Sequence, residues 1–549
     1  MKKIIFPLIL TFLAFFVQAQ QPPQLAADAP DQVPVLTACG NAAPYAATIT
    51  AEDLRSYLTI LASDDMEGRE TGTEGQRKAA DFIASHFAKL GLPKIGDKAG
   101  DGEATYFQYI AFISEKWENG QISLSVNGNK YRHRTDYYSI PTENSSRGEA
   151  SASEVVFLGY GIDDPKYNDY DAVDVKGKTI LIYKDEPVSK KGISYLTGTT
   201  ELSDWSSNWR LKLEAAQKHG VSTVFIIDPD IRASVSKLRS NLLSTRMKMG
   251  WGEQPDGKYA NSYFISSAVA ENIAGKKFKK FIKVRDGIEK SGKPASITLP
   301  CIVGMLQVKQ VRQLTGSNVM GYIEGTDPEL KDEVVVVTAH YDHLGKRGPS
   351  IYNGADDDGS GTVTVMEIAQ AFAQAKKDGN GPRRSVLCML VSGEEKGLLG
   401  SSYYSENPVF PIENTVADLN IDMIGRMDKN HSDSNYVYVI GADRLSTTLH
   451  DINAAANDAF THIDLDYTYN AKSDPNRFYY RSDHYNFAKK GIPSVFYFSG
   501  VHEDYHQPTD TVDKIMFGKM ENIAHLIFYA AWELANRDER IQVNVEEED

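Results

Sequence analysis

The sequence contains little cysteine for its length, and this excludes one way of stabilising an exported protein. Only 3 cysteines occur among 549 residues, at Cys39, Cys301 and Cys388. Three thiols cannot build a disulfide framework, and one must stay unpaired if the other two join. We therefore expect large hydrophobic cores. Because domains usually contain about 100 to 200 residues, the length predicts at least two of them.

Positive charge is also scarce. The chain carries 59 Lys and Arg against 74 Asp and Glu, a formal net charge of -15 at pH 7. A protein this acidic is repelled by phosphate backbones, so we expect no nucleic-acid partner. Long hydrophobic runs are absent beyond the N-terminus. The sequence therefore predicts no membrane span.

The N-terminus has the pattern of a secretory signal. Two lysines precede an apolar run over 4–17, which is too short for a comfortable membrane span and has no basic flank after it. We predict a signal peptide at 1–20 and export to the periplasm or the exterior. Residues 36–39 resemble a lipid-attachment box, but a polar, proline-containing stretch separates them from the apolar run. A soluble mature chain is the favoured interpretation.

The next part of the chain divides into three regions. Residues 21–44 are rich in Gln, Pro, Ala and Asp without periodicity, which predicts a flexible lead-in. Apolar residues at helical spacing predict two amphipathic helices, near 54–61 and 79–90. Short β runs around one helix, near 211–218, indicate a separate β-rich domain over 150–295.

From residue 332 onward, apolar strands alternate with helices. Strands or helices are expected at 334–338, 363–375, 386–391, 417–422, 437–440 and 495–498, with a last helix at 520–536. This alternation predicts an α/β fold: a mixed, largely parallel sheet with helices on both faces. Residues 45–149 and 296–540 would form this domain, interrupted by the 150–295 insert.

Polar side chains follow the predicted strands where each strand ends. His340, the pair Glu394 and Glu395, and Asp422 each come directly after an apolar run, and segments 354–361 and 502–506 lie at loop–helix junctions. Reactive groups of open α/β sheets gather at the carboxyl ends of the strands. We therefore expect these five segments to meet.

Imidazole and carboxylate ligands without thiolate suit zinc in a hydrolytic site. Two histidines and three carboxylates are too many for one catalytic zinc that keeps a position open for water. If Asp356 bridges two ions, each gains one histidine and one terminal carboxylate, and a shared water becomes the nucleophile. Glu394 would then be free to accept the water's proton. Asp342 could accept the ring N–H of His340.

The acidic run 356–361 also has an alternative interpretation. With Glu367 at its twelfth position it nearly fits a calcium-binding EF-hand loop. The preceding residues 345–354 include Pro349 and other turn formers, so no entering helix is expected. A calcium loop would also leave the other ligand-bearing segments unexplained.

These segments resemble the bacterial leucyl aminopeptidase-like family of co-catalytic zinc metallopeptidases. The resemblance covers the two first helices, the charged loop 63–72 between them, and nearly all of 320–535. It implies two zinc ions per chain and a cis peptide after the bridging aspartate, Asp356. The implied ligands are His340, Asp356 and Asp422 for one ion, and Asp356, Glu395 and His506 for the other, with Glu394 as general base.

Further expectations follow from the resemblance. Residues 150–295 look like an inserted protease-associated domain, interpreted as a lid or a substrate-steering module. Tyr505 matches a position that in similar peptidases places a hydroxyl near the developing oxyanion, the alternative being plain core packing. Segment 480–484 would line the pocket for the substrate's terminal residue, with His484 structural.

The sequence therefore predicts an exported zinc aminopeptidase that hydrolyses N-terminal residues from peptides. A carboxypeptidase or dipeptidase with the same two-zinc site is the main alternative, because no feature shows which chain terminus enters the pocket. Glutaminyl-cyclase-like relatives use one zinc and fewer ligands. Relatives that serve as non-catalytic binding modules have lost ligands, whereas this chain retains every expected position.

Overall fold

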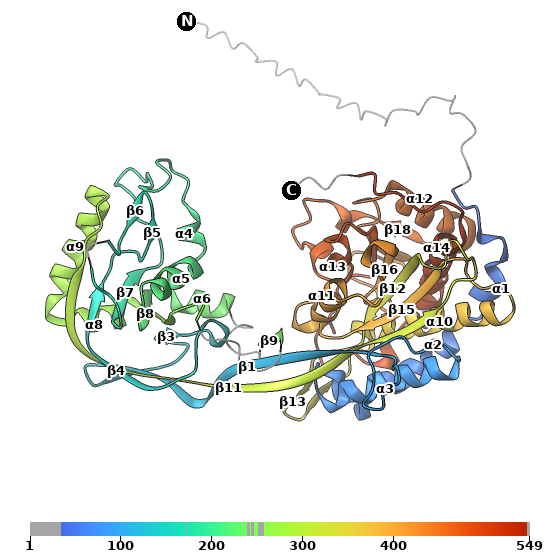
Figure 1. Ribbon diagram of the computed structural model, residues 1–549, viewed down its shortest axis with the longest axis horizontal. Helices are drawn as coiled ribbons and strands as arrows, with labels where there is room; N and C mark the ends of the chain where they lie inside the picture. The colour runs from blue at the N-terminus through green and yellow to red at the C-terminus, as the bar shows by residue number, and fades with distance from the viewer. Residues whose placement is uncertain (1–34, 172, 239–241, 243–245, 251–256, 546–549) are drawn as a thin grey trace, which may run out of the picture.

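The computed structural model describes residues 35–171, 173–238, 242, 246–250 and 257–545. The predicted signal peptide and most of the predicted lead-in lie outside the described residues. The chain forms two lobes joined by two long strands, β1 (Phe107–Val126) and β11 (Ile297–Ile323) (Figure 1). Within the described ranges, no helix combines the length and apolar composition that a membrane span needs.

The first lobe is built on an α/β sheet, as predicted. Its core strands are β12 (Val334–His340), β15 (Ser385–Val391), β16 (Thr415–Ile421) and β19 (Ser494–Phe498). These four run parallel in the order β19-β16-β12-β15, whereas β17 (Tyr436–Ile440) and β11 add antiparallel pairs at either side. The mixed, largely parallel sheet of the sequence prediction is therefore confirmed.

Helices cover both faces of this sheet because successive strand residues point to opposite sides. Val335 and Val337 pack in one core, while Val334 and Val336 pack in another. The helices on the first face are α2 (Ala51–Leu61), α3 (Glu74–Lys89), α10 (Gly361–Lys377), α12 (Thr447–Ala456) and α14 (Phe517–Asn536). The helices on the second face are α11 (Leu399–Glu406) and α13 (His484–Ala488).

The end of the predicted flexible lead-in is ordered. Residues 39–46 form the short helices η1 (Cys39–Asn41) and α1 (Ala43–Ala46). Glu533 of α14 is fully buried and accepts hydrogen bonds from the backbone of Thr37 at 2.9 Å and of Ala38 at 2.8 Å. A buried carboxylate needs such donors, so this segment is held against the core. Part of the predicted lead-in therefore packs on the first lobe and includes short helices.

The second lobe contains more helix than the sequence predicted. Its parallel strands are β4 (Arg147–Phe157), β7 (Thr179–Tyr183), β8 (Thr223–Ile227) and β10 (Asn261–Ile265). The expected helix is α5 (Arg210–Lys218), and α6 (Ile231–Lys237), α8 (Ser267–Ala274) and α9 (Phe278–Ser291) are additional. Helix α9 is rich in lysine and buries only Phe281 and Ile288 fully, so its apolar stripe is narrow.

The two lobes share one sheet of 15 strands. Strand β1 pairs with β11 from Phe107 opposite Val319 to Val126 opposite Val303, with a shift in register after Trp117. The two lobes are therefore connected by a continuous antiparallel ribbon. This ribbon begins before the predicted domain boundary at residue 150.

One buried acid on α10 gives a testable expectation for stability. Glu367 is fully buried, and burial raises its pKa to about 8, with the charge of Asp53 adding to the shift. A carboxyl whose folded pKa lies above its unfolded pKa stabilises the fold below the unfolded value, near 4.5, and this contribution is lost as the pH rises through about 8. At pH 9 the free energy of unfolding of Glu367→Gln should therefore exceed that of the wild type by a few kcal/mol in order of magnitude, and the variant should unfold at a higher temperature.

The measurement is thermal unfolding of chelator-treated protein at pH 5, 7 and 9. Glu52→Gln, on an exposed position of α2, is the matched control and should follow the wild type at each pH. A Glu367→Gln curve parallel to the wild type would show that Glu367 is not protonated in the fold.

Candidate metal centre

Most of the predicted site residues meet at the carboxyl edge of the first lobe's sheet. His340 is the last residue of β12, Asp422 follows β16, and Glu394 and Glu395 lie in the short helix η6 (Glu394–Lys396) after β15. His506 comes from the loop after β19. The fifth contributor is the short helix η5 (Ala355–Ser360), which precedes α10. The topology thus explains why segments far apart in the sequence converge.

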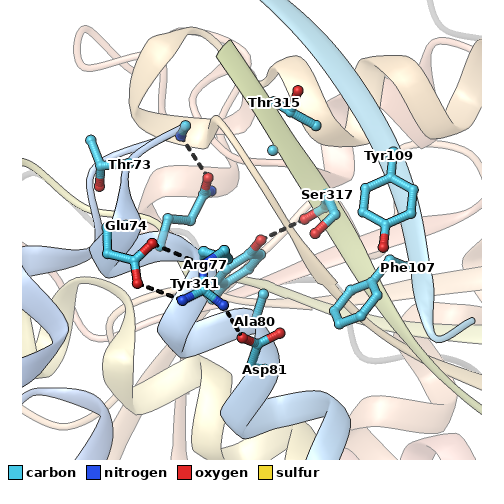
Figure 2. Close-up of a pocket in the computed structure, with 13 residues that line it drawn as sticks. Thr73, Glu74, Arg77, Ala80, Asp81, Phe107, Tyr109, Thr315, Ser317 and Tyr341 are labelled. Carbon is cyan, nitrogen blue, oxygen red and sulfur yellow. Dashed lines mark hydrogen bonds and ion pairs between the residues drawn. The ribbon is translucent and has the colours of Figure 1, made fainter.

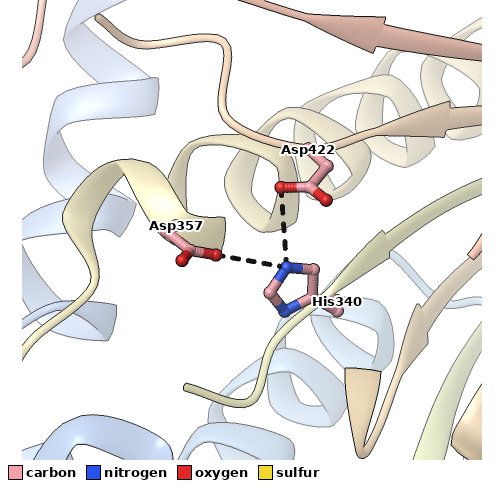
Figure 3. A group of neighbouring side chains, drawn as sticks. All are labelled: His340, Asp357 and Asp422. Atoms are coloured by element: carbon pink, nitrogen blue, oxygen red, sulfur yellow. Dashed lines mark ion pairs between the residues drawn. The ribbon is translucent and has the colours of Figure 1, made fainter. Parts of the chain in front are cut away.

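The first group of candidate ligands is His340, Asp357 and Asp422 (Figure 3). His340 Nε2 lies 3.4 Å from Asp357 Oδ1 and 3.6 Å from Asp422 Oδ1. All three residues are buried. Ser482 donates to the other oxygen of Asp422 at 2.8 Å, which fixes the orientation of that carboxylate.

The second group shares Asp357. Its Oδ2 lies 3.0 Å from His506 Nε2, and Glu395 Oε1 lies 3.3 Å from the same nitrogen. A fourth side chain, His343, approaches the same two carboxylate oxygens and forms a candidate metal group with Asp357 and Glu395. His343 is not among the ligands predicted from the sequence, although it lies only three residues after His340 at the end of β12.

The structure corrects the predicted bridging residue from Asp356 to Asp357. Asp356 faces away from the two groups: its Oδ1 accepts the N–H of Gly425 at 2.6 Å, and its Oδ2 lies 3.1 Å from His502 Nε2. Neighbouring residues of one short helix project in different directions, so only one of three consecutive aspartates can occupy the centre. The cis peptide bond is displaced likewise, since it joins Asp357 to Asp358 instead of following Asp356.

The remaining aspartates fix the backbone around the site. The carboxylate of Asp358 accepts the N–H of His340 at 3.2 Å and that of Met423 at 3.1 Å. Asp510 accepts the N–H of Asp357 at 3.1 Å. Because these N–H groups belong to ligands or their neighbours, the buried carboxylates hold the ends of β12, β16 and η5 together.

Asp342 has a different role from the predicted one. His340 Nδ1 lies 3.0 Å from the backbone oxygen of Asp342, whereas the Asp342 carboxylate is 4.0 Å away. That carboxylate accepts hydrogen bonds from Thr71 Oγ1 at 2.6 Å and from the backbone N–H of Glu394 at 3.1 Å. Asp342 therefore orients His340 through its carbonyl and holds the turn that carries Glu394.

Glu394 and Tyr505 border the two ligand groups. Glu394 Oε2 lies 3.8 Å from His340 Nε2. Burial raises the pKa of Glu394 well above its ordinary value; His340 opposes the shift and Glu395 and Asp422 add to it. Burial also raises the pKa of Tyr505 above its ordinary range, so its hydroxyl stays protonated and can donate.

An apolar pocket opens beside the ligand groups. Hydrophobic side chains form its wall. Its polar end consists of Asp357, Glu394, Asp422, Arg481, Tyr505 and His506. The apolar residues are Met423, Phe478, Phe496, Phe498 and Val501. His484, predicted to be structural, stacks on Phe496 with ring centroids 5.0 Å apart.

A second cavity lies between α3 and the strands β1 and β11 (Figure 2). Its charged side chains pair with one another, since Arg77 contacts Glu74 and Asp81 at 2.5 Å each. Tyr341 closes its floor by donating to the backbone oxygen of Ser317 at 2.6 Å. None of the predicted site residues lines this cavity, so the reaction site is assigned to the apolar pocket.

The donors present fit metal ions. Asp357 Oδ2 and Glu395 Oε1 are buried and have no hydrogen-bond partner among the described residues, although each faces histidine nitrogens. Buried charged oxygens require a compensating partner. Carboxylates and imidazoles without thiolate suit zinc or a similar divalent ion. The calcium-loop alternative does not fit, because the segment before η5 forms the strands β13 (Gly345–Arg347) and β14 (Ser350–Tyr352) in place of a helix.

Comparison with known proteins identifies peptidases that resemble this chain. The model of peptidase family M28 matches residues 318–531. A probable leucine aminopeptidase of Trichophyton verrucosum is 32% identical over 241 residues, which cover 43% of this chain and 63% of the relative. Aminopeptidase YwaD of Bacillus subtilis is 25% identical over 242 residues, covering 43% of this chain and 48% of the relative.

The solved structure of an aminopeptidase from Aneurinibacillus sp. strain AM-1 resembles this chain with a TM-score of 0.53 and 18% identity, over 91% of this chain and 98% of that one. Likeness at this identity shows a shared fold.

Residues 318–531 thus match peptidase family M28, and the predicted resemblance to aminopeptidase-like zinc metallopeptidases is confirmed. The chain spans 63% of the length of the leucine aminopeptidase it matches. The protease-associated assignment of the insert stays a prediction.

Proposed function

We propose that this chain is an exported aminopeptidase that removes N-terminal residues from peptides with two zinc ions. The observation that carries the proposal is the position of Asp357. Its Oδ1 faces His340, and its Oδ2 faces His506. One carboxylate therefore serves two ligand groups, as a bridge between two ions requires.

Bound zinc would polarise the scissile carbonyl and lower the pKa of water. His340, Asp357 and Asp422 would hold one ion, and Asp357, Glu395 and His506 the other. Glu394, which adjoins both groups without belonging to either, would take the proton from the attacking water and deliver it to the leaving amine. Its carboxylate lies 3.8 Å from His340 Nε2, close enough to reach a water held in the first ligand group.

The apolar pocket would receive the side chain of the terminal residue. Met423, Phe478 and Phe498 form part of its wall, so we expect hydrophobic terminal residues to be preferred over charged ones. Tyr505 lines the same pocket, with its ring stacked on His506 at 3.9 Å between centroids. Its protonated hydroxyl would stabilise the developing oxyanion.

Tyr505→Phe should lower kcat by about 10²-fold, because one donor to the oxyanion is lost while the ring packing is kept. KM for an aminoacyl anilide should change little. Phe498→Leu, which alters the pocket wall but no donor, is the control and should act on KM in preference to kcat. Unchanged turnover of Tyr505→Phe would assign Tyr505 to packing alone.

The second lobe is proposed to steer substrates, as a protease-associated module. Strand β9 (Arg246–Met249) of the insert pairs with β1 and lies beside η6, the helix that carries Glu394. This contact brings the insert next to the turn that carries Glu394. The signal-like N-terminus supports export to the periplasm or beyond the cell.

The function is tested by mass spectrometry of peptides incubated with the zinc-loaded chain. Each peptide is supplied free, N-acetylated and C-amidated. Shortening from free N-termini that acetylation blocks is the expected result. Shortening from the C-terminus that amidation blocks would overturn the aminopeptidase proposal in favour of a carboxypeptidase.

A carboxypeptidase or dipeptidase with the same centre is the second candidate, favoured by Arg481. Its guanidinium lines the pocket and lies 3.5 Å from the Tyr505 hydroxyl. An arginine there matches a substrate carboxylate better than a free amine. Cleavage of dipeptides alone would support a dipeptidase, and no cleavage at all would support a binding module.

A further inference from the structure

His343 has contacts that none of the roles above explains. It is fully buried, and its ring lies against η6 and His506, with a centroid distance of 5.9 Å to the His506 ring. Its Nδ1 lies 2.9 Å from Glu395 Oε1 and 3.7 Å from Asp357 Oδ2. All three atoms nevertheless have no hydrogen-bond partner among the described residues.

Three buried polar atoms that face one another without hydrogen bonds call for a cation between them. A tetrahedral zinc site with bonds of about 2.0–2.1 Å separates its ligand atoms by about 3.3–3.4 Å. The distances from the two histidine nitrogens, His343 Nδ1 and His506 Nε2, to the carboxylate oxygens Glu395 Oε1 and Asp357 Oδ2 scatter around that value, at 2.9, 3.0, 3.3 and 3.7 Å. His343, Asp357 and Glu395 can therefore reach one position, and His506 contacts the same two carboxylate oxygens.

The ring of His343 is held in this orientation. Its backbone N–H donates to the oxygen of Arg69 at 3.1 Å, and a Cβ at Gly354 would lie 2.6 Å from the ring. Gly354 also has a φ of 54°, a left-handed backbone conformation that favours glycine over residues with a side chain. A ring fixed by its neighbours loses little freedom on binding an ion, which favours affinity.

We propose that His343 is a fourth protein ligand of the second metal position, with His506, Glu395 and Asp357. This inference rests on the proposed function, because it assumes that the centre holds two ions. It makes the two positions unequal: His340, Asp357 and Asp422 hold the first ion with three protein ligands and leave room for water, whereas the second ion has four. The second position should therefore fill first and bind more tightly.

The test compares metal binding by the wild type, His343→Phe and His343→Asn. Phenylalanine keeps a ring in the space, and asparagine keeps polarity. After chelation and confirmation of the fold by circular dichroism, each chain is titrated with zinc against a chromophoric chelator. Both variants should bind one zinc ion as tightly as the wild type does. Their affinity for the other ion should fall by about tenfold or more, because loss of a group that only hydrogen-bonds to a ligand already weakens binding about tenfold.

His484→Phe is the matched control, since His484 is equally buried but belongs to neither ligand group. It should bind two ions as the wild type does. X-ray absorption of the zinc-loaded wild type should show three imidazoles shared by two ions, and His343→Phe two. Unchanged zinc affinity in both His343 variants, or two imidazoles in the wild type, would overturn the assignment.

The outcomes also separate this inference from the proposed function. A wild-type chain with two ions and three imidazoles that cleaves no peptide would retain the assignment of His343 and refute the aminopeptidase. A wild-type chain that binds no zinc would refute both.

Discussion

Asp357→Asn is expected to lose both ions and to lower peptide hydrolysis by several orders of magnitude, because its two oxygens serve both ligand groups. Asp356→Asn should retain both ions. Its carboxylate contacts Gly425 and His502 outside the groups, so its loss should cost no more than about 10- to 100-fold in metal affinity or activity.

The pair is measured by metal analysis after dialysis and by hydrolysis of an aminoacyl anilide. Because the two residues are adjacent and chemically identical, each variant is the control for the other. Metal loss in Asp356→Asn with retention in Asp357→Asn would restore the assignment made from the sequence.

Glu394→Gln should keep both ions and lose about 10²- to 10⁴-fold in kcat, the usual contribution of a general base. The amide preserves the shape of the side chain but cannot accept a proton from water. Since the backbone N–H of Glu394 donates to Asp342 and is unaffected, the turn should stay in place.

Glu395→Gln is the matched comparison for this experiment. It removes a charged ligand next to Glu394, so its zinc content should fall along with its activity. If Glu394→Gln also released zinc, Glu394 would be a ligand and another group would have to serve as the base.

The fold of the first lobe could be predicted because its strands are buried on both faces. The apolar runs ending at His340 and before Asp422 are long enough to identify strands, and polar residues at their ends locate the site. The second lobe gave weaker signals. Half of the residues of helix α9 are charged, and β11 alternates buried and exposed residues over its first half.

The choice among Asp356, Asp357 and Asp358 could not be made from the sequence, because it depends on the backbone angles of η5. Asp357 and Asp358 depart there from helical geometry. The role of Asp342 was misjudged for a related reason: a backbone oxygen is a partner that every residue offers, so spacing alone cannot exclude it. His343 could not be assigned from the sequence, because two histidines already supply one imidazole ligand to each of two ions.

The shared ribbon has a consequence for how the chain is made. Phe107 of β1 pairs with Val319 of β11, and the whole second lobe is encoded between them. A growing chain must therefore present α2, α3 and β1 without their partner strand until the insert has been synthesised, and long-range pairing of this kind is slow. The order of synthesis thus makes the second lobe available to fold before the sheet that carries the metal ligands can close.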